Sequence, residues 1–351
     1  MISVAPHVPL IRRYQDWLRA TRGITFDDYD ALWRWSVTDL DGFWRSVWDY
    51  ADVRSPDRPG TVLAERRMPG AVWFPGTRVN YAREVLRHVD AAHAAGVPLL
   101  VDSTLTSPWL IKPFDHGADL VYHSATKFLS GHGTVIGGVV VDGGSFDWER
   151  SGRFAELTQA YDGFHGMVFS EESTVGAFLL RARREGLRDF GASMSPHTAW
   201  LILQGIETLP LRMERHIDNT QKVVEFLAEH PFVARVGHPL MPAHPSHALA
   251  GKLLRHGARG AGAVFSFDLK GSRAQGKAFV EGLRLFSHLA NIGDVRSLVI
   301  HPASTTHSQL TPEEQVTTGV TPGLVRLAVG LEGIEDILAD LDAGFRAAKA
   351  A

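Results

Sequence analysis

The sequence contains no cysteine, which excludes disulfide bonds, thiolate zinc sites and cysteine nucleophiles. A strong charge of one sign is also missing: the formal net charge is −3, so nothing favours nucleic acid or an anionic membrane as a partner. No apolar run approaches the roughly 18–20 residues of a membrane span. A signal-peptide pattern is absent, because charges come before any long apolar stretch. We therefore expect a cytoplasmic protein.

The composition changes along the chain, which indicates two segments of different origin. Six of the nine tryptophans lie in the first 73 residues, whereas sixteen of the seventeen histidines lie from His88 onward. We expect a first segment over residues 1–88, a ligand-binding domain over 89–230 and a C-terminal domain over 231–351.

The first segment has the pattern of short helices with aromatic faces. A capping box is expected at Ser36-x-x-Asp39, and residues 55–60 are expected to form a loop. Apolar residues follow the capping box at helical spacing: Leu40, Phe43, Trp44 and Val47. The tryptophans can form a stacking surface for a ring-bearing ligand, but aromatic stripes of this kind usually pack, and we favour a small core or a docking face.

The second segment alternates between helices and short, almost wholly apolar strands, which predicts a mainly parallel sheet covered on both faces. Strands are expected within 97–102, 116–124 and 137–144, and a helical stretch broken at Leu209–Pro210 follows them. Residues 231–351 predict an α+β module with strands within 262–270 and 324–330 and a final helix. The fold class is therefore α/β with a C-terminal α+β domain and a small helical N-terminal segment.

Lys127 stands in an unusual setting, "HSATKFLSGHG", directly after an apolar strand. Asp102 ends another strand, and the carboxyl ends of parallel strands meet at one edge of the sheet, where ligands bind. Ser124 and Thr126 place two hydroxyls beside the lysine. This set suits pyridoxal 5'-phosphate (PLP): the amine forms an imine, the carboxylate holds the pyridine nitrogen and the hydroxyls bind phosphate. The alternative is an aspartate that caps a turn and a lysine that extends to water.

Other motifs are weaker. "SGHGTVIGG" lacks the residue order of a nucleotide-binding P-loop, and no G-x-S-x-G or H-E-x-x-H motif occurs. His301 and His307 lack a third ligand, and we expect no metal site. Four further histidines are expected to be solvated loop residues, because prolines interrupt the stretch that carries them: His238, His244, His247 and His256.

From about residue 89 to 351, the chain resembles the Cys/Met-metabolism PLP enzymes, of the O-acetylhomoserine sulfhydrylase type. The resemblance rests on "AHAAGVPLLVDST", "HGADLVYHSATKFLSGHGT", "LQGIETLPLRMERH", "LFSHLANIGDVRSLVIHPASTTHSQL" and "GLVRLAVGLE". Related lyases and cystathionine synthases usually carry a serine-leucine-glycine-glycine stretch where this chain has "ANIGD". The resemblance implies part of a fold-type I PLP-transferase large domain.

The resemblance also implies roles for individual residues. Lys127 corresponds to the Schiff-base lysine, which also shuttles the proton at the substrate carbon, and Asp102 to the partner of the pyridine nitrogen. Ser124 and Thr126 correspond to phosphate contacts.

Two further residues correspond to substrate contacts. Arg326 is expected to bind the substrate carboxylate through two parallel hydrogen bonds, which a planar guanidinium favours. Ser297 lies in a stretch that borders the substrate.

Several features of the family have no recognisable counterpart in this sequence. The family's phosphate cup, its ring-stacking tyrosine and the residues lent across the dimer interface precede the region of resemblance, and residues 1–88 contain no recognisable replacement. Trp109 is one aromatic candidate for stacking on the ring. Residues 1–88 instead resemble the N-terminal region of acetoacetyl-CoA synthetases, without that family's adenylate-forming core.

The function implied is γ-replacement on O-acetylhomoserine with sulfide or a thiol, giving homocysteine or methionine, in a homo-oligomer. We expect weaker cofactor binding than in the full family, because anion sites at helix N-termini supply much of phosphate binding. The alternative is a non-catalytic fusion remnant or a scaffold that depends on a partner. Acyl-CoA ligase activity is remote.

Overall fold

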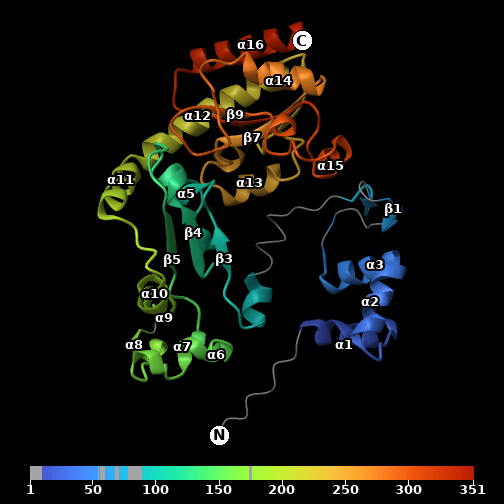
Figure 1. Ribbon diagram of the computed structural model, residues 1–351, viewed down its shortest axis with the longest axis vertical. Coiled ribbons are helices and arrows are strands. Elements are labelled where there is room, and N and C mark those ends of the chain that lie inside the picture. The colour runs from blue at the N-terminus through green and yellow to red at the C-terminus, as the bar shows by residue number, and fades with distance from the viewer. Residues whose placement is uncertain (1–9, 54, 56–59, 68–70, 78–88, 174–175) are drawn as a thin grey trace. The chain divides into compact units, whose positions relative to one another are not determined.

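The computed structural model describes residues 10–53, 55, 60–67, 71–77, 89–173 and 176–351. The chain divides into two compact units, Met1–Val85 and Leu86–Ala351, and Figure 1 shows the elements of each. The expected loop at residues 55–60 lies largely outside the described residues. No described helix is long and apolar enough to cross a membrane.

The first unit is a small helical assembly with an aromatic core. Its elements are α1 (Leu10–Arg22), α2 (Tyr29–Thr38), α3 (Leu40–Tyr50) and the antiparallel pair β1 (Leu63–Glu65) and β2 (Val72–Trp73). Leu18 and Leu32 are buried, and Trp17 and Trp35 pack against them. The preference for packing is confirmed for these two tryptophans, whereas Trp33 is 53% exposed.

Two aspartates, and not Ser36, cap α2 and α3 of this unit. Asp28 accepts a hydrogen bond from the Ala31 amide at the start of α2, and Asp39 accepts one from the Gly42 amide at the start of α3. Ser36 lies inside α2, where its hydroxyl donates to the Trp33 carbonyl. The capping box predicted at Ser36 is wrong, because α2 continues to Thr38 and the short Asp39 side chain caps the next helix itself.

The second unit contains a sheet of three short strands, β3 (Leu100–Asp102), β4 (Leu120–Ser124) and β5 (Gly138–Asp142). Strands β3 and β4 are parallel, and β5 pairs with β4 in the antiparallel direction. An antiparallel edge strand on a parallel pair is common in α/β proteins. The parallel pair brings the carboxyl ends of β3 and β4 to one edge of the sheet, where the predicted site residues stand.

Short helices and turns surround this sheet. Helical residues 89–94 precede β3, and α5 (Ser107–Leu110) and the turn η1 (Pro113–His116) link β3 to β4. Those that follow β5 are α6 (Trp148–Ser151), α7 (Ala155–Thr158), η3 (Asp162–Phe164), α8 (Phe169–Glu172), α9 (Ala177–Arg181), η4 (Ala182–Leu187) and α10 (Arg188–Phe190). Trp148 and Phe169 form a buried cluster with Leu120 of β4.

The C-terminal part is a five-stranded sheet of order β6-β7-β10-β9-β8 with helices packed on it. Its strands are β6 (Val233–Gly237), β7 (Val264–Leu269), β8 (Ser287–His288), β9 (Leu298–Ile300) and β10 (Leu324–Ala328). Its other elements are α13 (His247–Leu253), η5 (Gly257–Gly260), α14 (Arg273–Glu281), η6 (Pro302–Ser304), α15 (Pro312–Thr317) and α16 (Ile334–Ala350). The strands and the final helix predicted here are confirmed.

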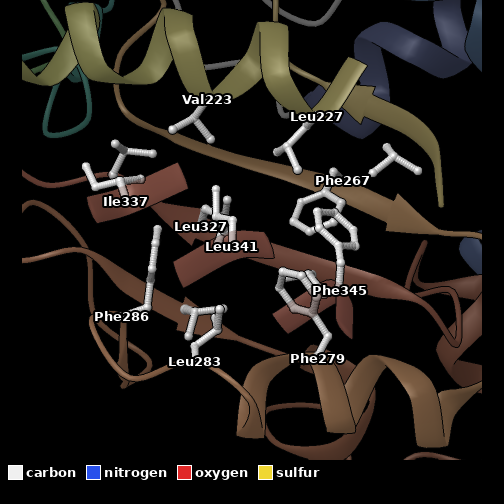
Figure 2. Packing of buried hydrophobic residues seen from close by; sticks show 14 of the residues in the cluster. Val223, Leu227, Phe267, Phe279, Leu283, Phe286, Leu327, Ile337, Leu341 and Phe345 are labelled. Carbon is white, nitrogen blue, oxygen red and sulfur yellow. The ribbon is translucent and has the colours of Figure 1, made fainter. Parts of the chain in front are cut away.

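The core of this part is aromatic at its centre (Figure 2). Phe267 of β7, Phe279 of α14 and Phe345 of α16 are fully buried and contact one another, and Val223 and Leu227 approach them from α12. Burial of each such side chain stabilises the fold by about 1.5–3 kcal/mol. This core therefore holds β10 and its neighbours firmly.

Helix α12 (Leu209–Glu229) is shared between two cores. It follows α11 (Pro196–Glu207) after the single residue Thr208, with Pro210 in its first turn. The helical stretch is therefore broken, as predicted, but one residue before Leu209–Pro210. Its first half packs with the lysine-bearing turn through Met213 and Ile217, and its second half belongs to the C-terminal core. The boundary predicted at residues 230/231 stays a prediction.

Candidate active site

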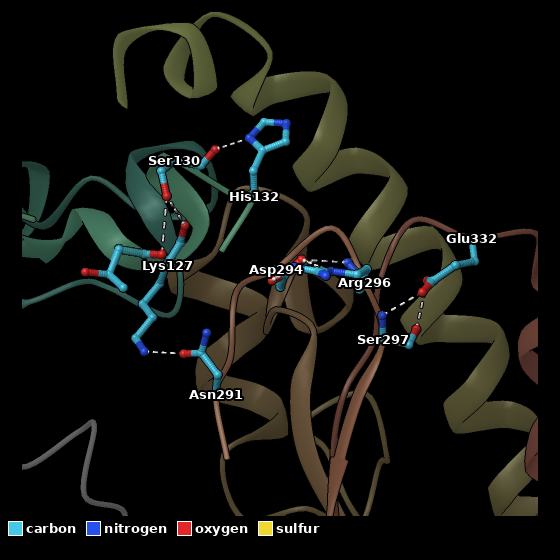
Figure 3. A network of polar contacts seen from close by, with 9 residues as sticks. Lys127, Ser130, His132, Asn291, Asp294, Arg296, Ser297 and Glu332 are labelled. Atoms are coloured by element: carbon cyan, nitrogen blue, oxygen red, sulfur yellow. Dashed lines mark hydrogen bonds and ion pairs between the residues drawn. The ribbon is translucent and has the colours of Figure 1, made fainter. Parts of the chain in front are cut away.

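Lys127 lies in one helical turn, η2 (Ala125–Leu129), directly after β4. Its backbone is not helical, with φ −92° and ψ −129°, so the chain kinks at this residue. Its side chain is half-buried, and the Nζ group donates a hydrogen bond to Oδ1 of Asn291 (Figure 3). The amine therefore extends from the edge of one sheet to a loop of the C-terminal part.

The carbonyls at the end of this turn are bound by a buried arginine. Nη1 of Arg212 donates to the Phe128 carbonyl at 2.8 Å, and Nη2 donates to those of Leu129 at 3.2 Å and Gly205 at 2.5 Å. The last carbonyls of a helix have no partner within it, and here the guanidinium supplies one. Burial lowers the pKa of Arg212. Arg212 was not predicted from the sequence, where it lies in the stretch "LRMERH".

The loop that carries Asn291 is fixed against the same turn. Gly293 has φ +72°, and a Cβ there would lie 2.7 Å from the Phe128 nitrogen and 2.8 Å from the Lys127 Cβ. Two residues later, the Val295 amide donates to the Gly131 carbonyl at 2.8 Å. The close approach of the two backbones requires a residue without a side chain.

Asp102 and Ser124 stand at the carboxyl ends of β3 and β4 and are joined by Thr104. Oδ1 of Asp102 accepts from the Thr104 amide at 2.9 Å and from its hydroxyl at 2.6 Å, and the same hydroxyl accepts from the Ser124 amide at 2.8 Å. Asp102 is exposed. Thr104 was missed by sequence reasoning, although it is the second residue after the strand end in "VDST".

The two hydroxyls predicted to bind phosphate, those of Ser124 and Thr126, differ in their hydrogen bonds. The Ser124 hydroxyl forms no hydrogen bond with the part of the chain that the structure describes, so it is free for a ligand. The Thr126 hydroxyl instead accepts from the Gly137 amide at 3.0 Å and lies 3.3 Å from the Gly137 carbonyl. Thr126 therefore holds β5 against the lysine turn, and a phosphate contact stays a prediction for both residues.

Arg326 lies on β10 and points toward the loop that receives Lys127. Its Nη2 group donates to the Asn291 carbonyl at 3.3 Å. The guanidinium is half-buried, burial lowers its pKa, and none of the described carboxylates forms an ion pair with it. The structure thus brings the predicted lysine and the predicted substrate arginine to one residue, Asn291.

Ser297 is fully buried and turned toward Glu332 (Figure 3). Its hydroxyl donates to Oε2 of Glu332 at 2.9 Å and accepts from the Gly330 amide at 2.8 Å, and its amide donates to Oε1 of Glu332 at 2.7 Å. The only hydrogen of the hydroxyl is therefore already used. The substrate contact predicted for Ser297 is not supported by this geometry.

Trp109, the aromatic candidate for stacking on the ring, has local partners. The Arg255 guanidinium lies 3.6 Å from the centre of the Trp109 ring, and the indole donates to Glu214 at 3.2 Å.

His238 is 1% exposed, accepts from the Leu240 amide and donates to the Gly262 carbonyl, and burial lowers its pKa to about 4. The prediction of a solvated loop residue is wrong for His238.

A separate cavity of about 650 Å³ lies away from the lysine, between residues 93–96 and 145–153. Its buried acidic group, Asp119, accepts from the Leu99 amide at 2.8 Å and from the Ser145 hydroxyl at 3.1 Å, and it pairs with His93 at 2.7 Å. These partners satisfy the carboxylate, so we assign Asp119 a structural role.

Comparison with known proteins places this geometry in a family. Residues 75–346 match the model of the Cys/Met metabolism PLP-dependent enzymes. The chain belongs to this family. Residues 29–85 match the model of the acetyl-coenzyme A synthetase N-terminus, and both predicted resemblances are confirmed.

Curated relatives of this PLP-dependent family include sulfhydrylases. The O-acetyl-L-homoserine sulfhydrylase of Leptospira meyeri is 52% identical over 259 residues, which cover 72% of this chain and 58% of that protein. The homocysteine synthase of Schizosaccharomyces pombe is 51% identical, with coverage of 72% and 59%. The chain thus spans about six tenths of the length of these relatives.

A solved structure in the same family supports the fold. The putative O-acetylhomoserine (thiol)-lyase of Campylobacter jejuni has a TM-score of 0.70 and 34% identity, covers 75% of this chain and 62% of its own, and contains a pyridoxyl-lysine monophosphate. The predicted fold class is confirmed, and so is the predicted cofactor as that of the family.

The residues present in this family member fit its cofactor in chemical type. Within the described ranges, Lys127 offers an amine with one hydrogen-bond partner, Asp102 has a second carboxylate oxygen that Thr104 does not use, and the Ser124 hydroxyl has no partner. An amine, a carboxylate and a hydroxyl at one sheet edge are the groups that the aldehyde, pyridine nitrogen and phosphate of PLP require.

Proposed function

We propose that this chain binds PLP and catalyses γ-replacement on O-acetylhomoserine, in which sulfide or a thiol replaces acetate to give homocysteine or methionine. The observation that carries the proposal is the meeting of Lys127 and Arg326 at Asn291. The amine that holds the cofactor and the guanidinium that holds a carboxylate thus both contact the same residue. An amino-acid substrate needs both.

Each residue has a separate task in this proposal. Lys127 holds the cofactor and then carries the proton at the substrate α-carbon. Arg326 binds the substrate carboxylate, and its partial burial strengthens the hydrogen bonds that it makes. Asp102 keeps the pyridine nitrogen protonated, and Ser124 contributes to phosphate binding. The cofactor itself, when bound, supplies the electron sink for the reaction.

The same proposal includes a homo-oligomer in the cytoplasm, with sulfide or a thiol as second substrate. Apolar side chains exposed along α11 support self-association, since Trp200 is 54% and Leu203 59% exposed. The cytoplasmic location rests on composition alone. Size-exclusion chromatography with light scattering tests whether the protein is a homo-oligomer.

The alternative of a non-catalytic remnant or partner-dependent scaffold is supported by β3. It is an edge strand of the described sheet, and Leu100 on it is 56% exposed. An open edge with exposed apolar residues is typical of a strand that pairs with further chain.

The deciding experiment is cofactor binding by the full chain. We expect that the protein purified with PLP has a visible absorption band, that borohydride fixes the cofactor on Lys127, and that Lys127→Ala removes the band. Lys112→Ala, at an exposed lysine of the same unit, is the matched control and keeps it. A protein without the band supports the scaffold instead. If the band is present, release of acetate from O-acetylhomoserine with sulfide tests turnover.

A further inference from the structure

Two cationic side chains from distant parts of the sequence converge on Asn291. The Lys127 Nζ group donates to its side-chain oxygen, and the Arg326 Nη2 group donates to its main-chain carbonyl at 3.3 Å. Neither cation forms an ion pair with a carboxylate of the described residues. A buried charge is ordinarily paired with an opposite charge, whereas these two half-buried cations share one neutral residue.

The loop around Asn291 cannot move independently of the lysine turn. The packing of Gly293 on the Lys127 backbone and the bond from the Val295 amide to the Gly131 carbonyl fix the loop on one side. Within the loop, the buried Asp294 accepts from the amide and guanidinium of Arg296, which stabilises the loop's own conformation. A change in the hydrogen bonds of Asn291 is therefore transmitted to the turn that carries Lys127.

An amide suits a lysine that changes its charge. The side-chain oxygen accepts from the charged ammonium group, and the amide nitrogen donates to the lone pair of the neutral amine after rotation. A carboxylate in the same place would favour the charged form strongly. Asparagine thus positions the amine without placing a charge beside it.

The bond from Arg326 links this position to the substrate. At 3.3 Å it is long, and a carboxylate that binds the guanidinium through two parallel hydrogen bonds is a stronger partner for Nη2. Once the carboxylate binds, the Asn291 carbonyl loses its donor.

We propose that Asn291 is a positioning residue that couples occupation of Arg326 by a carboxylate to the reactivity of the Lys127 amine. The inference rests on the proposed function, because it takes Arg326 as the carboxylate site. Thermodynamic coupling of this kind is reciprocal: a variant that changes the hold on Lys127 also changes the affinity of Arg326 for carboxylates.

The experiment measures the Lys127 amine directly and needs no cofactor. The full chain is labelled by trace reductive methylation across the neutral and alkaline pH range, and the extent at Lys127 is measured by mass spectrometry with the exposed Lys112 as internal standard. We expect Asn291→Asp to lower labelling of Lys127 near neutral pH by about tenfold or more, because an opposite charge nearby shifts a pKa by about 1–3 units. Asn291→Ala should raise labelling of Lys127 near neutral pH, because the charged amine loses the acceptor of its hydrogen bond.

Coupling is tested with butyrate, a carboxylate that lacks the amino group. We expect butyrate to change Lys127 labelling by a few-fold in the natural chain and to leave it unchanged in Asn291→Ala and in Arg326→Met. Asn291→Gln keeps the amide and should restore part of the response, which a merely structural residue would not do.

The proposal is overturned if folded Asn291→Ala and Asn291→Asp give the pH profile of the natural chain, or if butyrate has the same effect with and without Asn291. Circular dichroism verifies that each variant is folded. Failure of the visible PLP band, with the labelling effects present, contradicts the proposed function and leaves the contact between Asn291 and Lys127 intact.

Discussion

The two ends of the candidate site are built differently. At the lysine end, the turn after β4 is held by Arg212, by the backbone of Gly293 and by Asn291, all of them contacts within the second unit. At the other end, Asp102 is exposed on a three-residue edge strand, and among the described residues its carboxylate is bound by Thr104 alone. The amine is therefore positioned by several contacts of this unit, whereas the carboxylate for the ring stands on an exposed strand end.

The largest expected effect comes from removing the guanidinium behind the lysine turn. Arg212→Met keeps much of the side-chain volume but removes the donor of the Phe128 and Leu129 carbonyls, and it leaves the Gly205 carbonyl with the Thr208 hydroxyl at 3.3 Å. Each buried group left without a partner costs about 1–3 kcal/mol, so we expect a loss of about 3–5 kcal/mol in the free energy of unfolding, measured by urea denaturation.

Arg215→Met is the matched control for this variant. Arg215 lies on the same helix, is exposed, and donates to the carbonyls of Leu331 and Glu332 at 3.4 and 3.1 Å. We expect a change within about 0.5 kcal/mol, as is usual for surface positions. Equal losses for the two variants would show that the lysine turn does not depend on Arg212.

A smaller effect is expected where the Asn291 loop touches the turn. Gly293→Ala places a Cβ against the backbone of Lys127 and Phe128 and also forces a left-handed conformation, which costs roughly 1–2 kcal/mol for residues with a side chain. We expect a total loss of about 2–4 kcal/mol, because the close contact adds the kind of cost seen when a core is overpacked.

Gly319→Ala separates the two causes. Gly319 has φ +82°, and nothing lies within 4 Å of an added Cβ, so this variant meets only the conformational cost. Urea denaturation of both variants gives the difference. If the two losses agree within experimental error, the loop does not press on the lysine turn.

The sequence was sufficient for the strand ends but not for what holds them. Apolar strands followed by Asp102 and by Lys127 were recognisable, because both features are local. Arg212 and Asn291 act on residues 84 and 164 positions away, and no local pattern contains such distances. Glu332 and Gly330, which bind the Ser297 hydroxyl, are also distant in sequence, 35 and 33 positions away, and the substrate contact of Ser297 stays a prediction.

The smallest effect on stability is expected at the open end of the site, at Asp102. Asp102→Asn keeps an oxygen for the Thr104 amide and hydroxyl and removes only the charge of an exposed side chain, so the free energy of unfolding should change by no more than about 0.5 kcal/mol. The affinity for PLP should nevertheless fall, because a neutral amide does not hold a proton on the pyridine nitrogen. Spectral titration with PLP measures this, with Asp115→Asn, at an exposed aspartate of η1, as control. An unchanged affinity would mean that Asp102 does not meet the ring, and that this end of the site does not bind the cofactor as proposed.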